Sequence, residues 1–116
     1  RLIDVALDGL ARDVCMGVMR ARYRDGLNKP RLIEPGKVLK YSIRLSPTSN
    51  AFLPGHRIRL DVTSSDFPNY DRNHNTAAAP NADATLAVAQ QTIHHGRAYP
   101  SQIILPWVSN AEPVGR

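Results

Sequence analysis

The chain has 116 residues, of which 42% are hydrophobic and 22% are charged; this length suits one domain, and this composition excludes a disordered chain. No apolar run approaches the roughly 18 residues that a membrane-spanning helix requires. The formal charge of +5 comes without a Lys/Arg-rich run or aromatic residues suited to base stacking. We therefore expect a solvated basic face or a docking surface for an acidic partner domain rather than a nucleic-acid site.

The first expected element is a β-hairpin. Residues 2–7 alternate weakly between apolar and polar and run into Asp8-Gly9, a two-residue hairpin signal because both positions tolerate positive φ. The return arm spans residues 11–24, where helical spacing is also compatible with the apolar positions, but the turn favours a strand. One face of this arm becomes basic at three positions: Arg20, Arg22 and Arg24.

Two more strands are expected in the middle of the chain. Residues 37–46 and 57–62 both alternate between apolar and polar or charged side chains, the period of a half-buried strand. Each is preceded by a Pro-Gly pair, at residues 35–36 and 54–55. Such a pair suits the centre of a type II turn, because proline presets φ and glycine supplies positive φ.

A polar, turn-prone loop follows the second of these strands from Ser64 onward. A loop of this kind at the end of a core strand usually contacts something. Its oxygen-rich side chains could bind calcium, but the spacing of an EF-hand is absent, and capping of turns is the favoured interpretation. The oxygen-rich residues are Asp66, Asn69, Asp71, Asn73 and Asn75.

Strands are also expected at residues 85–95 and 101–107, before an unstructured tail at residues 109–116. Strands with long connections and no convincing helix predict an all-β fold, an antiparallel β-sandwich of the jelly-roll, galactose-binding-like kind. Because the chain starts inside an apolar alternation, we expect residues 1–108 to be part of a longer protein and the sandwich to lack its first strands.

Nothing in the sequence predicts a catalytic, metal or cofactor site. There is no Gly-x-Ser-x-Gly nucleophile elbow. His94 and His95 would face opposite sides of a strand, so they cannot chelate one ion together. The lone Cys15 permits no internal disulfide, which gives no sign of an oxidising compartment and favours the cytoplasm.

Within the polar loop, Tyr70 and Arg72 are the residues best suited to recognition, because tyrosine offers a large amphipathic face and arginine a fork of donors. In the alternative interpretation, Phe67 and Tyr70 plug the core and Asp71 pairs locally with Arg72. The sequence leaves these two readings open.

Three strings carry a resemblance: GHRIRL at residues 55–60, SSDFP at 64–68 and DRNHNT at 71–76. Together they resemble the C-terminal β-domain of serine hydrolases of the X-prolyl dipeptidyl peptidase and cocaine esterase type. The basic positions 20–24 and the turn at 34–36 agree with it. Where that family often has glycine, this chain has Ala77, so that turn is expected to differ.

The resemblance implies a non-catalytic jelly-roll domain that packs on an α/β-hydrolase domain, in the same protein or in a separate chain, and shapes the surroundings of its active site. The catalytic triad of that family lies upstream, so none of it is carried onto this chain, and homo-oligomers are left open. The alternative is a free-standing carbohydrate- or ligand-binding jelly roll, favoured by Tyr70, Tyr99 and Trp107. The expected domain-docking loop comprises Phe67, Tyr70, Asp71, Arg72, Asn73 and Asn75.

Overall fold

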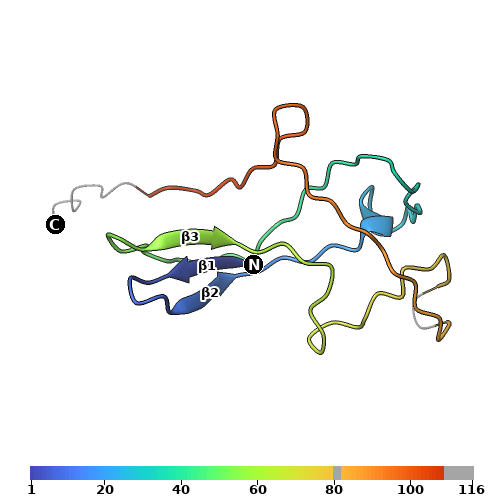
Figure 1. The fold of residues 1–116 in the computed structure, drawn as a ribbon, viewed down its shortest axis with the longest axis horizontal. Helices are drawn as coiled ribbons and strands as arrows, with labels where there is room; N and C mark the ends of the chain where they lie inside the picture. The colour runs from blue at the N-terminus through green and yellow to red at the C-terminus, as the bar shows by residue number, and fades with distance from the viewer. Residues whose placement is uncertain (80–81, 109–116) are drawn as a thin grey trace. The chain divides into compact units, whose positions relative to one another are not determined.

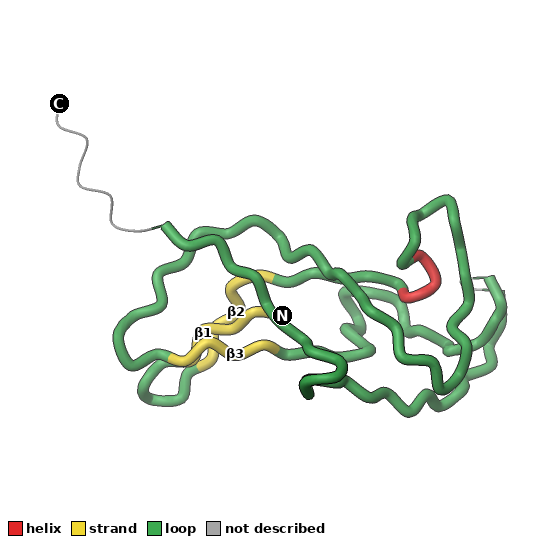
Figure 2. The backbone as a smooth tube through the Cα atoms, turned by 90° about the horizontal axis from the view of Figure 1, so that it is seen from above, coloured by secondary structure: helices red, strands yellow, loops and turns green. Residues whose placement is uncertain are grey.

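The computed structural model describes residues 1–79 and 82–108 and divides into two compact units, Arg1–Leu86 and Ala87–Arg116. All regular elements of the described residues lie in the first unit, and Figure 2 draws the strands in yellow and the helix in red. They are the strands β1 (Leu2–Val5), β2 (Ala11–Cys15) and β3 (Arg57–Leu60) and the short 3₁₀ helix η1 (Ala21–Tyr23). No helix in the described part of the chain is long and apolar enough to cross a membrane.

The three strands form one antiparallel sheet in the order β2-β1-β3 (Figure 1). Leu2 pairs with Leu60 and Val5 with Arg57, while the register against β2 shifts between Leu2 and Ile3. All four residues of the central strand β1 are buried. The predicted all-β, antiparallel class is confirmed.

The hairpin between β1 and β2 differs in detail from the predicted two-residue turn. The amide of Gly9 donates to the carbonyl of Ala6 at 3.0 Å, and the amide of Ala6 donates to the carbonyl of Leu10 at 2.8 Å. Gly9 has φ of 87°. This is the three-residue loop in which a positive-φ glycine follows a tight turn. The Asp8 carboxylate accepts from the Leu10 amide at 2.9 Å and so fixes the turn.

Both Pro-Gly turns are present. The amide of Lys37 donates to the carbonyl of Glu34 at 3.2 Å, and the amide of His56 to that of Leu53 at 3.0 Å. Gly36 and Gly55 have φ of 76° and 82°, the left-handed conformation that the third position of a type II turn needs.

The long return arm is not a single strand, contrary to the sequence prediction. Its ladder ends at Cys15, and residues 21–23 form η1. The amides of Tyr23 and Arg24 close this turn by donating to the carbonyls of Arg20 and Ala21, at 2.9 and 3.3 Å. The side chains of the alternating arginines therefore project from a 3₁₀ turn and its two ends, and not from one face of a strand. The side chains of Arg22 and Arg24 bond to backbone carbonyls, which a turn allows them to reach.

The predicted strands at 37–46, 85–95 and 101–107 are not strands in the structure. Period-2 alternation describes an extended backbone, whereas a strand also needs a hydrogen-bonded neighbour. The 37–46 segment has a short contact of this kind, because the Ser46 amide and hydroxyl both donate to the Met16 carbonyl, at 2.9 and 2.8 Å. The predicted tail at 109–116 lies outside the described residues.

The strand predicted at residues 57–62 is present as β3 over four residues, but it is not half-buried. Ile58 and Leu60 are 53% and 46% exposed, and β3 is an edge strand of the described sheet. In the second unit, the rings of His94 and Tyr99 lie 5.3 Å apart at 52°. The Ser101 hydroxyl donates to the His94 carbonyl there.

Candidate docking loop and its anchors

The loop that follows β3 presents all six of its predicted docking residues to solvent. Phe67 and Tyr70 are 65% and 48% exposed, and Asp71, Arg72, Asn73 and Asn75 are exposed as well. Neither aromatic ring plugs the core, and no ion pair joins Asp71 to Arg72 in the described structure. The Phe67–Pro68 peptide bond is cis. The described structure thus shows neither the core plug nor the local ion pair of the alternative interpretation.

The beginning of the loop is tied to the sheet by Arg1. Its guanidinium pairs with the carboxylate of Asp66 and, at 2.8 Å, with that of Asp13 in β2. The field of Asp66, followed by the hydrogen bond to it and the field of Asp13, raises the pKa of Arg1 above its ordinary value. Asp66 also accepts from the Tyr70 amide at 3.1 Å through its carbonyl. The start of the loop is therefore fixed on the strands.

The far side of the loop is held by Arg22 of η1. One guanidinium nitrogen of Arg22 donates to the carbonyls of Thr76 and Ala78, at 3.2 and 2.9 Å. Hydrogen bonds from a charged donor are stronger than neutral ones, and two backbone carbonyls of an irregular segment need such partners. Arg22 thus holds two loop residues that lie 54 and 56 positions after it in the sequence.

Asp83 holds the same segment from another position. One carboxylate oxygen lies 2.8 Å from Nδ1 of His74, and the other accepts from the Thr76 hydroxyl at 2.8 Å. The hydrogen bond from His74, followed by that from Thr76, lowers the pKa of Asp83 below its ordinary value. Arg22 and Asp83 together fix residues 74–78.

These anchors divide the segment into an inner and an outer side. His74, Thr76 and Ala78 are half-buried and face the anchors, whereas Asn73 and Asn75 between them are exposed. Asn75 has φ of 58°, a conformation that asparagine tolerates better than most residues. Its amide donates to Oδ1 of Asn73 at 3.2 Å, and Nδ2 of Asn73 donates to Oδ1 of Asn75 at 2.8 Å.

Two Asp–His pairs were not predicted from the sequence. Besides His74 and Asp83, Nδ1 of the nearly buried His56 lies 2.8 Å from the carboxylate of Asp4 on β1. Each pair resembles two thirds of a hydrolase triad, but no serine hydroxyl bonds either imidazole among the described residues. The first pair fixes the loop, and the second joins β1 to the turn before β3.

Comparisons with known proteins show which family the chain belongs to. The profile of the X-Pro dipeptidyl-peptidase C-terminal non-catalytic domain matches residues 1–104. The chain belongs to this family. It is also 46% identical over 108 residues to the cocaine esterase of Rhodococcus sp. (strain MB1 Bresler), an alignment that covers 91% of the chain. No solved structure matches significantly.

The dipeptidyl-peptidase C-terminal domain is a part of larger proteins, and the chain spans 19% of the length of the curated esterase that it matches. The family predicted from the strings at residues 55–60, 64–68 and 71–76 is confirmed. The local sequence gave no sign of the roles of Arg22 and Asp83, because each is tied to loop residues by hydrogen bonds that no local pattern encodes.

Proposed function

We propose that this chain is the non-catalytic β-domain of a serine hydrolase and that its anchored loop docks on the α/β-hydrolase domain. The observation that carries the proposal is the two-sided structure of residues 73–78. Their inner side bonds to Arg22 and Asp83, and their outer side is exposed. A surface loop fixed this firmly has lost much of its conformational entropy before any partner binds, which favours docking.

The exposed residues have the chemistry of an interface. Tyrosine and arginine are enriched among the residues that dominate binding energy, and here Tyr70 and Arg72 lie two positions apart on the exposed part of the loop. The guanidinium of Arg72 makes no ion pair in the described structure, so its donors are available to carbonyls or carboxylates of a second domain. Asn73 and Asn75 add exposed polar surface beside it.

The contribution of the domain is indirect in this proposal. A catalytic triad belongs to the hydrolase domain, and the docked loop would shape the surroundings of that active site. Identity of 46% to a protein named as an esterase favours an ester or acyl substrate over a peptide with a penultimate proline. The domain would thus influence which substrates reach the triad and how stably the two domains remain together.

The test is Arg72→Ala in the complete enzyme that carries this chain. Arginine is enriched among the minority of interface residues whose truncation costs about 2 kcal/mol or more, so we expect the midpoint of thermal unfolding to fall by a few degrees, or kcat/KM to fall severalfold. Arg57→Ala, which removes an exposed arginine from edge strand β3, is the matched control and should leave both values unchanged.

Unchanged thermal stability together with unchanged kinetics in Arg72→Ala would count against docking through this loop. Saturable binding of a glycan by a protein that lacks any hydrolase domain would instead support a free-standing binding module.

A further inference from the structure

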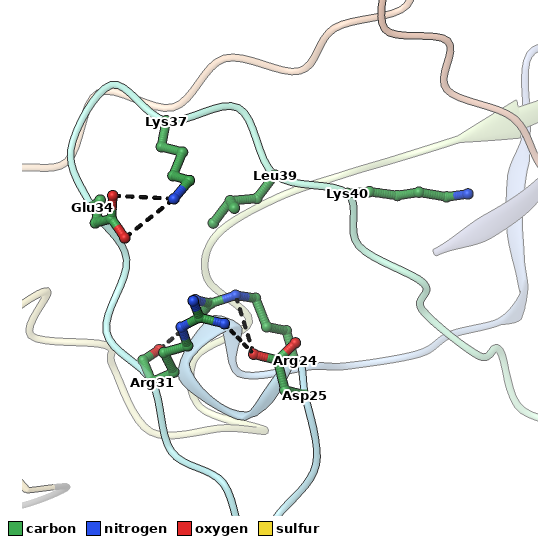
Figure 3. A pocket seen from close by; sticks show the side chains of 7 residues that line it. All are labelled: Arg24, Asp25, Arg31, Glu34, Lys37, Leu39 and Lys40. Carbon is green, nitrogen blue, oxygen red and sulfur yellow. Dashed lines mark hydrogen bonds and ion pairs between the residues drawn. The ribbon is translucent and has the colours of Figure 1, made fainter.

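A second polar site lies apart from the docking loop, where η1 meets the segment that follows it. It is an open pocket of about 240 Å³ (Figure 3). Four cationic side chains, two carboxylates and one leucine line it: Arg24, Arg31, Lys37, Lys40, Asp25, Glu34 and Leu39. Cations thus outnumber carboxylates two to one, so a small anion is the ligand that its charge favours.

Arg24 gives this pocket a fixed positive charge. Its side chain is only 10% exposed, and its guanidinium donates to the carbonyls of Ala21, Arg31 and Leu32 at 3.0, 2.7 and 3.3 Å. These neutral acceptors hold the group in place without cancelling its charge. The nearest carboxylate oxygen, from Asp25, lies 4.0 Å from its Nε.

Two other cations are held only by exposed partners. Nη1 of Arg31 lies 3.4 Å from the Asp25 carboxylate, and Nζ of Lys37 lies 3.2 Å from both oxygens of Glu34. More than half of the Arg31 and Lys37 side chains is exposed. Exposed ion pairs of this kind contribute little to stability, so an incoming anion can compete for both cations at small cost.

Lys40 adds charge at longer range. No carboxylate lies within ion-pair distance of it in the described structure, and it extends away from the other side chains (Figure 3). Leu39 contributes the apolar part of the lining.

We propose that this pocket binds a small anion of the phosphate or carboxylate class, with the fork of Arg31 and the ammonium of Lys37 as its direct ligands and Arg24 as the fixed charge beneath. Arginine donates two parallel hydrogen bonds to such oxyanions, and lysine adds a point charge. The site shares no residue with the docking loop, so it does not depend on the proposed function.

The test is calorimetric titration of inorganic phosphate, and separately of citrate, into the complete polypeptide at low and constant ionic strength. We expect saturable binding of one anion per chain in the millimolar range. The double variant Arg31→Ala/Lys37→Ala should bind at least about tenfold more weakly, because it removes both direct ligands. Arg12→Ala/Lys29→Ala removes the same charge from exposed positions outside the pocket and should bind as the unmodified protein does.

The single variant Arg31→Lys keeps the charge and removes only the fork, so it should lose a part of the affinity. It also serves if the double variant does not fold. Tighter binding of phosphate or of citrate assigns the class of anion, and either result supports the site. Absence of saturable binding overturns the proposal, and so does equal weakening by the two double variants, since that would trace binding to the overall charge.

Discussion

The sheet β2-β1-β3 and the loop after β3 belong to one compact unit but are held in different ways. The sheet is held by backbone ladders on both edges of β1, whereas the loop is held largely by charged side chains, above all Arg22 and Asp83. A ladder is a property of the backbone and tolerates many side chains on its edge strands. The loop depends on a few individual residues, so single substitutions and pH should act on it more selectively.

The largest effect is expected where backbone packs on backbone, at Gly17 just after β2. A Cβ atom there would lie 2.2 Å from the Arg44 carbonyl oxygen and 3.1 Å from Cγ2 of Ile43. Gly17→Ala should therefore destabilise this domain by about 1–3 kcal/mol, the usual cost of overpacking, as measured by pulse proteolysis of the complete polypeptide. Gly96→Ala, where a Cβ meets nothing within 4 Å, is the control, and equal stability of the two variants would contradict the close approach.

A smaller and more local effect is expected from Arg22→Ala. It removes two hydrogen bonds to the loop, a net loss of about 1 kcal/mol because the freed carbonyls can bond to water instead, and leaves the ladders of β1 intact. Hydrogen exchange should become faster in residues 74–78 and stay unchanged in β1. Arg20→Ala, two positions earlier and exposed, should change neither, and faster exchange in β1 alone would refute the separation of the two regions.

The smallest effect is expected from pH, through Asp83. Because the pKa of this carboxyl is lowered in the folded protein by its bonds to His74 and Thr76, the folded loop binds the proton more weakly than the unfolded chain does. Its contribution to stability is then complete above the ordinary aspartate range, near pH 4, and is lost as pH falls through the lower folded-state pKa.

Protection factors of residues 74–78, corrected for the intrinsic exchange rate, should thus decrease as the solution is acidified below about pH 4. Asp83→Asn removes the titrating group and should abolish this part of the pH dependence. An unchanged acid response in the variant would mean that Asp83 does not hold the loop.

The sequence predicted the local features of this fold well and its long-range features poorly. Both Pro-Gly turns and the hairpin before β2 follow from residues that are adjacent in the chain, and the family follows from short strings. The end of the ladder at Cys15 and the exposure of Ile58 could not be predicted, because pairing and cover come from residues far away. Alternation alone therefore predicted strands at 37–46 and 85–95 that the structure does not contain.

For the candidate docking site, too, the sequence indicated local features and could not indicate contacts with distant residues. The sequence left open whether Phe67 and Tyr70 face solvent or plug the core, and the structure exposes both. The anchors could not be found from composition, since Arg22 was interpreted as one of several basic residues on a strand face. Only the three-dimensional positions of the Thr76 and Ala78 carbonyls show why this arginine is needed.

The most direct test of the docking proposal is site-specific photocrosslinking in the complete enzyme. A photoreactive aromatic residue in place of Tyr70 should form crosslinks to peptides of the α/β-hydrolase domain, identified by mass spectrometry. The same residue in place of Leu27, which is exposed in a turn outside the docking loop, sets the background. Crosslinks from position 70 that stay within this chain, or that do not exceed those from position 27, would contradict the proposal.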